Sequence, residues 1–207
     1  MAVGAFLLGS IPTGYLVGRL RGVDVRRLGS GSTGGTNVWR YAGMGAALLT
    51  IAGDALKALA AVYLANVLVG TGWSQVLAGT LAILGHIYSP FLGWRGGRGV
   101  VAALAVTGAL CFPALAVVLV AGAIVILASR YASLASLTIA TLMPVTLYAF
   151  TRGTDAGLWW PIFGVVAAVI IWVAHRGNVK RLIEGTERRI IWPPKALEPL
   201  LGRRRVG

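Results

Sequence analysis

Long runs of apolar residues, separated by glycine, proline and charged residues, constrain this chain more than any other feature. They cover the first eighteen residues and the ranges 44–70, 73–92, 99–129, 131–150 and 157–174. A helix needs roughly 20 apolar residues to cross a bilayer. With 57% hydrophobic and 12% charged residues in 207, too little polar sequence remains for a separate soluble domain. The sequence therefore predicts an all-α integral membrane protein, with residues 1–207 forming one membrane-embedded domain.

The distribution of positive charge predicts the number of spans. Read as one helix, the run 99–129 gives six spans and leaves the basic C-terminal region outside the cell. That region contains Arg176, Lys180, Arg181, Arg188, Arg189, Lys195 and Arg203–Arg205. Such an arrangement violates the positive-inside rule. A split at Phe112 and Pro113 gives seven transmembrane helices, with the N-terminus outside and the C-terminus cytoplasmic. We therefore expect a multi-pass membrane protein whose basic end lies on the cytoplasmic side.

Composition also argues against several classes of function. A net charge of +13 in so apolar a chain suits anionic lipid or anionic substrates better than nucleic acid. Cys111 is the single cysteine, which excludes an intrachain disulfide. No pair of histidines or carboxylates has metal-ligand spacing, so we expect neither a metal nor another cofactor. Phe91 and Lys180 stand five residues after the two histidines, where a common class of lipid acyltransferases has aspartate.

The first polar segment, residues 22–43, is rich in glycine and small hydrogen-bond donors. It reads GVDVRRLGSGSTGGTNVWRYAG and includes Ser30, Gly34, Gly35, Thr36, Asn37 and Arg40. Glycines permit close approach to a ligand, short side chains supply donors, and Arg40 supplies a rigid cationic fork, so the segment could cradle phosphate. The alternative is a flexible polar connector. The chance match to GxGxxG at 29–34 lacks the flanking strand of a dinucleotide site.

The second polar segment lies just before the apolar run that begins at residue 99. Gly96, Gly97 and Gly99 surround Arg98, a typical setting for anion binding at a helix N-terminus. We expect Arg98 to contact ligand and Arg95 to be an interface anchor. His86 at the end of the preceding run is either a hydrogen-bonded structural histidine or a catalytic one.

The third polar segment, AHRGNVKRLIEGTERR, starts at Ala174. His175 and Asn178 are three positions apart, so they share a helix face and could address one ligand. The basic residues that follow are expected to face lipid, with Glu184 and Glu187 balancing their charge. Ser136, on the same predicted side, is a further candidate, although small polar residues often serve only helix packing.

Two further charges lie inside an apolar run. Asp54 and Lys57 are three positions apart on the predicted second span. Such a pair is expected to hold the fold as an ion pair, although intramembrane charges also raise the question of function.

These three segments together resemble the signature motifs of the bacterial acyl-phosphate:glycerol-3-phosphate acyltransferase family. The resemblance rests on SIPTGYLVGRLRGVDVRRLGSGSTGGTNVWRYAG, GHIYSPFLGWRGGRG and HRGNVKRLIEGTE, in that order, and covers nearly the whole chain. Arg98 stands where the family usually has lysine. The resemblance implies a seven-helix fold with a cytoplasmic active site. It also implies transfer of a fatty acyl group from acyl phosphate to the sn-1 hydroxyl of glycerol 3-phosphate, giving lysophosphatidic acid and phosphate.

The same resemblance assigns roles to individual residues. Glycerol 3-phosphate would be held by Ser30, Arg40, Arg98, His175 and Asn178, the catalytic set being Ser30, Arg98, His175 and Asn178. The long-chain acyl phosphate would meet Gly34, Gly35, Thr36, Asn37, Gly96 and Gly97. His175 is expected mainly to position the acceptor, with a substrate phosphate oxygen as an alternative proton acceptor. The competing hypothesis is a small anion transporter or channel for phosphate, against which stands the scarcity of intramembrane charge.

Overall fold

The computed structural model describes residues 1–154 and 157–190, and every regular element in this part of the chain is helical. Lys195 and Arg203–Arg205, used above to orient the chain, lie outside the described residues. The α-helices are α1 (Ala2–Ser10), α2 (Thr13–Leu20), α3 (Gly35–Ala42), α4 (Met44–Leu68), α5 (Gly72–Ile87), α6 (Val100–Leu110), α7 (Phe112–Ser129), α8 (Ala132–Thr151), α9 (Trp159–Ala174) and α10 (Arg176–Ile183). Two short 3-10 helices, η1 (Val25–Arg27) and η2 (Pro90–Leu92), lie in the polar segments. The all-α prediction is confirmed.

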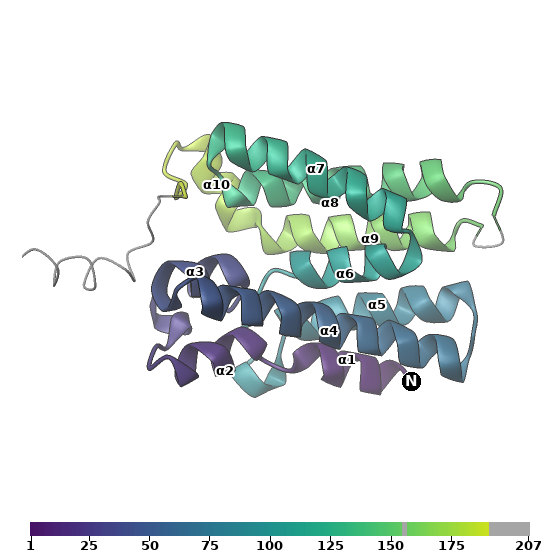
Figure 1. Ribbon diagram of the computed structural model, residues 1–207, viewed down its shortest axis with the longest axis horizontal. Helices are drawn as coiled ribbons and strands as arrows, with labels where there is room; N and C mark the ends of the chain where they lie inside the picture. Colours follow the sequence, from purple (N-terminus) through teal and green to yellow (C-terminus); the bar gives the residue numbers. More distant parts are fainter. Residues whose placement is uncertain (155–156, 191–207) are drawn as a thin grey trace, which may run out of the picture.

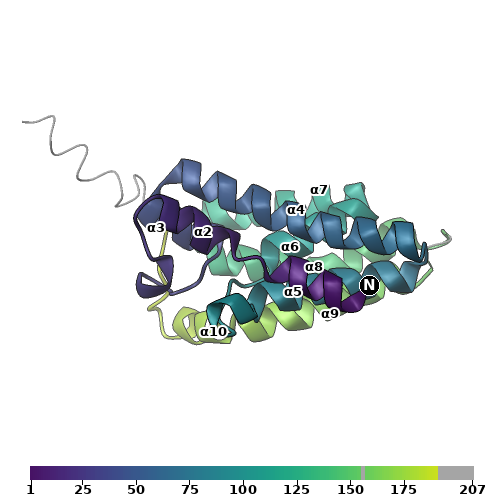
Figure 2. The same ribbon diagram turned by 90° about the horizontal axis from the view of Figure 1, so that it is seen from below.

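The long helices run side by side along one axis in two groups (Figure 1). One group contains α1, α2, α4 and α5, the other contains α7, α8 and α9, and α6 lies between them. The short helices α3 and α10 lie at the same end of the bundle in both ribbon views (Figures 1 and 2). The fold therefore brings the first and third polar segments to one end of the molecule.

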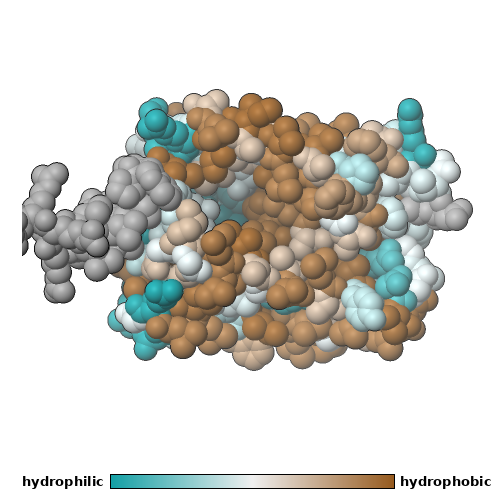
Figure 3. Space-filling model, viewed as in Figure 1, coloured by the Kyte–Doolittle hydropathy of each residue, from teal (hydrophilic) through white to brown (hydrophobic). Residues whose placement is uncertain are grey.

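Several helices are long and apolar enough to cross a membrane. Within the described residues there are five, covering Ala2–Leu20, Met44–Leu68, Gly72–Leu92, Phe112–Ser129 and Ala132–Thr151. The pair α9 and α10, bent by 61°, adds a sixth, and α6 is apolar but shorter. Hydrophobic residues cover the flank of the bundle, and hydrophilic ones gather toward its two ends (Figure 3). The multi-pass character is clear, while the count of seven spans and the orientation stay predictions.

Proline positions explain two breaks in the helical pattern. The predicted split of the long run is confirmed: α6 ends at Leu110, Cys111 is extended, and Pro113 stands in the first turn of α7. The first run, expected to be one helix, is broken as well. Pro12, which has no N–H and restricts the residue before it, separates α1 from α2. Carbonyl groups at this break become available to other side chains.

Small residues allow the first and fifth helices to pack closely. A Cβ atom at Gly9 would collide with the backbone of Ala82, and one at Gly85 would collide with the carbonyl of Phe6. Ala5, Ala78 and neighbouring alanines are buried in the same core. Small residues at such crossings are typical of helix packing in membranes. This contact fixes the end of α5, from which the second polar segment leaves.

Candidate active site

The first polar segment is a loop folded around the side chain of Asn37. Asn37 is buried, and its Nδ2 lies 3.0–3.1 Å from the carbonyl oxygens of Val25, Leu28 and Ser32. Its Oδ1 accepts a hydrogen bond from the Ser30 backbone at 3.3 Å. The donor role toward a substrate predicted for this side chain must be corrected, because these donors are used within the loop. Asn37 therefore shapes the site by holding the backbone of this loop in place.

The loop ends at the N-terminus of α3, where backbone donors become available. Gly34 is the N-cap residue, and Gly35 and Thr36 are the first two residues of the helix. The first amides of an α-helix have no intrahelical carbonyl partner and carry the positive end of its dipole. A Cβ atom at Gly35 would meet Ile51 of α4, so glycine lets α3 lie close against that helix. The geometry suits an anion, as the sequence predicted.

The second polar segment packs on the C-terminal end of α5. The amides of Gly96 and Gly97 donate to the carbonyl oxygens of Ile87 and His86, at 2.9 and 3.1 Å. The sequence predicted that these glycines receive an anion, and their amides are instead committed to protein carbonyls. A side chain at either position would collide with His86. The two glycines therefore provide close packing, which holds Arg98 beside them.

The third segment places His175 and Asn178 at the bend between α9 and α10. Both side chains are buried, with exposures of 1% and 3%. His175 lies just beyond the last residue of α9, and its Nδ1 is 2.9 Å from the Ile171 carbonyl oxygen. A carbonyl only accepts, so Nδ1 carries the proton and Nε2 of the neutral ring is an acceptor. Burial lowers the pKa of His175 to about 4, which keeps the ring neutral.

Glu187 is a site residue that the sequence did not single out. Its carboxylate accepts hydrogen bonds from Asn178 and Arg181, each at 2.7 Å, and from Ser133 at 3.0 Å. Burial opposes its ionisation, but these hydrogen bonds outweigh burial and lower its pKa below the ordinary value. The sequence predicted only that Glu187 balances nearby positive charge. Its contact with Ser133, 54 residues away in the chain, exists only in the folded protein. The one available signal was its scarcity, as the chain has six acidic residues.

These segments converge on one recess at the polar end of the bundle. Ten predicted residues line it: Ser30, Gly34, Gly35, Thr36, Asn37, Arg40, Arg98, Ser136, His175 and Asn178. Gly96 and Gly97 line an adjoining recess that shares Ser30, Arg98 and Asn178 with the first. Asp54, His86 and Glu187 also reach the first recess. Apolar residues of α4 and α6, namely Ile51, Val100 and Val101, complete its wall.

The recess carries unneutralised positive charge. Arg40, Arg98, Arg181 and Arg188 line it, and of these Arg181 pairs with Glu187. Among the described residues, no carboxylate lies within ion-pair distance of Arg40 or Arg98. The pKa of Arg98 is lowered to about 10, mainly by burial; Glu187 opposes this shift and the neighbouring arginines add to it. A half-buried cation that lacks a carboxylate partner is suited to an anionic ligand.

Two basic residues lie elsewhere than the sequence predicted. Arg181 and Arg188 were expected to face lipid, yet both line the recess. Arg181 is tied to Glu187, and the carbonyl of Arg188 accepts a hydrogen bond from Arg40 at 3.3 Å. The segment after α10 returns over the recess, which sequence spacing alone does not show. Ser136 donates its hydroxyl to the Ala132 carbonyl at 2.9 Å and still lines the wall.

Comparison with known proteins identifies the family. The model of the family described as glycerol-3-phosphate acyltransferase matches residues 1–185. The chain belongs to the glycerol-3-phosphate acyltransferase family. Glycerol-3-phosphate acyltransferase of Symbiobacterium thermophilum is 45% identical over 92% of this chain and 93% of its own. The protein of the same name from Thermosynechococcus vestitus is 40% identical, again over 92% and 93%.

Solved structures agree with this assignment. Two crystal structures of PlsY (YgiH), an integral membrane glycerol 3-phosphate acyltransferase, are similar at 32% identity. The glycerol 3-phosphate form gives a TM-score of 0.85 and covers 92% of this chain and 94% of that one. The lysophosphatidic acid form gives 0.83 and covers 97% and 96%. This chain is therefore an integral-membrane acyltransferase of phospholipid synthesis.

Proposed function

We propose that the enzyme transfers a fatty acyl group from a long-chain acyl phosphate to the sn-1 hydroxyl of glycerol 3-phosphate. The products are lysophosphatidic acid and inorganic phosphate. One observation carries the proposal: Arg40 and Arg98, both without a carboxylate partner among the described residues, share a recess with the N-terminus of α3. Two phosphorylated substrates need such cationic and amide donors. The apolar wall beside them suits an alkyl chain.

Glycerol 3-phosphate is bound by the predicted set Ser30, Arg40, Arg98, His175 and Asn178. The two arginines neutralise its phosphate, since each can form bidentate hydrogen bonds to phosphate oxygens. His175 has Nδ1 committed to Ile171, so its Nε2 accepts a hydrogen bond from the acceptor hydroxyl. Asn178 is held by Glu187 through Nδ2, which fixes the orientation of its amide. Glu187 is thus a positioning residue for Asn178.

The acyl phosphate binds with its head at the start of α3. The backbone at Gly35 and Thr36 faces it with first-turn amides and the helix dipole, while the Gly34 amide donates to Ser32 Oγ at 3.3 Å. Donors placed where negative charge develops stabilise a transition state by about 3 to 4 kcal/mol each. Ser136 of α8 lines the same recess, and the alkyl chain leaves between apolar residues of α4 and α6.

The reaction needs no covalent enzyme intermediate, because acyl phosphate is already a mixed anhydride. The sn-1 oxygen attacks the acyl carbonyl carbon, the bond from that carbon to the phosphate oxygen breaks, and phosphate leaves. The hydroxyl proton passes to a phosphate oxygen. A phosphate group with a pKa of about 6 is a stronger base than His175, whose pKa burial lowers to about 4. His175 therefore orients the hydroxyl rather than removing its proton.

We place the recess at the cytoplasmic face of the bacterial inner membrane. The basic segments that line it and the positive-inside rule support this side. A cysteine introduced at position 33 or 177 should resist membrane-impermeant thiol reagents added to intact cells. Labelling from outside would overturn the placement.

The decisive experiment measures phosphate release by the purified protein in detergent or lipid. Palmitoyl phosphate with glycerol 3-phosphate should give phosphate and lysophosphatidic acid, while acyl-CoA and acyl carrier protein donors should give none. Analysis of the product by regiospecific hydrolysis should place the acyl chain at sn-1. Phosphate uptake into liposomes without any release from palmitoyl phosphate would favour the transporter hypothesis instead.

A further inference from the structure

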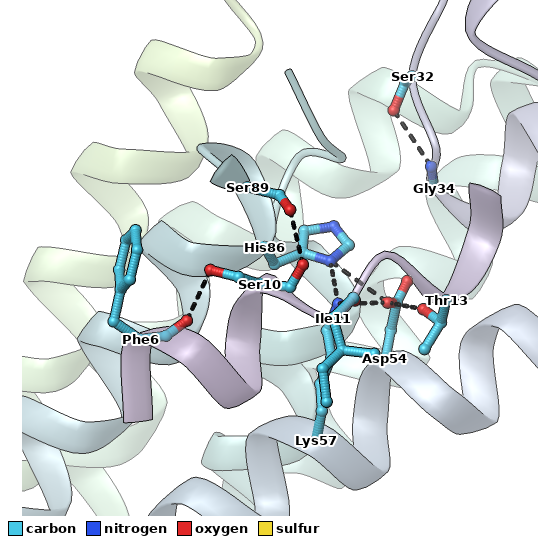
Figure 4. Close-up of polar contacts among 10 residues, drawn as sticks. All are labelled: Phe6, Ser10, Ile11, Thr13, Ser32, Gly34, Asp54, Lys57, His86 and Ser89. Carbon is cyan, nitrogen blue, oxygen red and sulfur yellow. Dashed lines mark hydrogen bonds and ion pairs between the residues drawn. The ribbon is translucent and has the colours of Figure 1, made fainter. Parts of the chain in front are cut away.

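A cluster of buried polar side chains lies beside the recess but outside the predicted substrate-binding set. Asp54 and Lys57 of α4 form an ion pair of 2.8 Å, and His86 of α5 joins them through Nδ1, 3.3 Å from Asp54 and 3.0 Å from Lys57 (Figure 4). Their exposures are 1%, 6% and 6%. The expected ion pair is therefore present, and it has a third member. We name Asp54, Lys57 and His86 the buried triad.

The triad is tied to the break between the first two helices. Lys57 Nζ donates to the Ile11 carbonyl at 2.7 Å, and the Thr13 hydroxyl donates to Asp54. Next to them, Ser89 donates to the Ser10 carbonyl at 2.6 Å (Figure 4). The last carbonyls of a helix lack intrahelical partners, so these side chains satisfy them. The break and the triad thus form one connected unit.

The other side of His86 supports the loop that carries Arg98. Its carbonyl accepts the Gly97 amide at 3.1 Å. Its Nε2 lies against Gly97, where any Cβ atom would overlap the ring. Arg98 follows directly, and Gly99 continues the loop at φ +81°, a conformation that favours glycine. The position of the imidazole therefore limits where the backbone of Arg98 can lie, and with it the point from which the Arg98 side chain extends.

We propose that His86, fixed by Asp54 and Lys57, is a positioning residue that holds the 96–99 loop and thereby aims Arg98 at the glycerol 3-phosphate phosphate. The inference rests on the proposed role of Arg98 in substrate binding. The helix break accounts for Lys57 and Asp54, which bind the Ile11 carbonyl and the Thr13 hydroxyl. His86 in addition contacts the Arg98 loop, and that contact gives it a role beyond the helix break.

A double-mutant cycle tests the proposal. His86→Asn, Arg98→Ala and the double variant are compared by kcat/KM for glycerol 3-phosphate with palmitoyl phosphate as donor. If His86 acts through Arg98, His86→Asn should lower kcat/KM about tenfold in the wild-type background and less than about twofold in Arg98→Ala. Most of the single-variant effect should lie in KM. Equal losses in both backgrounds would overturn the proposal.

Arg40 provides the matched control, because it lies on α3 and not on the 96–99 loop. The effects of His86→Asn and Arg40→Ala should be coupled much less than those of His86→Asn and Arg98→Ala, because Arg40 meets the loop only through the shared phosphate. A general distortion of the recess would instead couple His86 to both arginines alike, and that result would also overturn the proposal. Gly97→Ala offers a second route: it keeps all three triad residues but forces the His86 ring and the loop apart, so it should reproduce the coupling to Arg98 if His86→Asn fails to fold.

Calorimetric titration with glycerol 3-phosphate tests the positioning role of His86 independently of the proposal that acyl phosphate is the donor. Wild-type protein that binds glycerol 3-phosphate but releases no phosphate from palmitoyl phosphate would contradict the proposed function alone. In that case His86→Asn should still weaken binding about tenfold. Unchanged binding by a folded His86→Asn variant would contradict the positioning role whatever the donor.

Discussion

Lys57, which is buried, and Arg98, which is half-buried, are cations near the same recess, but they are used differently. Lys57 is neutralised within the protein by Asp54 at 2.8 Å and also donates to the Ile11 carbonyl at 2.7 Å. Arg98 has no carboxylate at ion-pair distance among the described residues and faces the recess beside Arg40. The first cation stabilises the junction of α1, α2, α4 and α5. The second is kept available, so its missing partner is expected to be the substrate.

Breaking the paired cation should produce the largest effect on stability. Lys57→Met leaves Asp54 buried without its main counter-charge, so the free energy of unfolding should fall by about 3 to 5 kcal/mol. Denaturation in mixed micelles measures it. The double variant Asp54→Asn with Lys57→Met removes both charges and should recover part of the loss. A single variant as stable as the double one would show that the pair does not act as an ion pair.

Removing the available cation should affect binding rather than stability. Arg98→Ala should raise KM for glycerol 3-phosphate from roughly thirtyfold upward, corresponding to a loss of about 2 to 5 kcal/mol. Steady-state kinetics checks this, with thermal unfolding expected to change little. Arg95→Ala, on the same loop but exposed, is the control and should behave like the wild type. An unchanged KM for Arg98→Ala would remove Arg98 from the substrate site.

The neutral ring of His175 should make stability depend on pH. Its pKa is about 4 in the folded protein, against 6.5 when unperturbed. Between these values the unfolded chain binds a proton that the folded chain does not, so stability falls as pH drops from 6.5 to 4. The loss is on the order of 3 kcal/mol. Unfolding measured across this range should show a shallower slope in His175→Asn, and identical slopes would refute a buried neutral ring.

Glu187 should give the smallest of these effects. Glu187→Gln keeps an acceptor for Asn178 but loses the charge that holds Arg181, which should cost about 1 to 3 kcal/mol in kcat/KM. Glu184→Gln is the matched control, because Glu184 is exposed and pairs weakly with Lys180 at 3.8 Å. Equal activity of the two variants would show that Glu187 only balances charge.

Local sequence signals predicted the helices and named many of the residues that line the recess. Pro113 predicted the break between α6 and α7, because proline is favoured in the first turn of a helix. Arg98, His175 and Asn178 were found because glycine neighbours and helical spacing are visible in the sequence. The break at Pro12 was missed because the apolar run continues on both sides of it. Its cost is offset by Lys57 of α4 and by Ser89, which lies just after α5.

The sequence by itself determined the chemistry: an apolar helical chain, a basic end, and three segments rich in glycine and phosphate-binding groups. These properties depend on residue type and on spacing within one helix or loop. Only the tertiary structure decided which cations are paired within the protein and which face the recess without a carboxylate partner among the described residues. Which further groups a cation contacts depends on residues 29 to 148 positions away, as His86 near Lys57 and the Arg188 carbonyl near Arg40 illustrate. Such distances in space are set by helix packing, which no local pattern records.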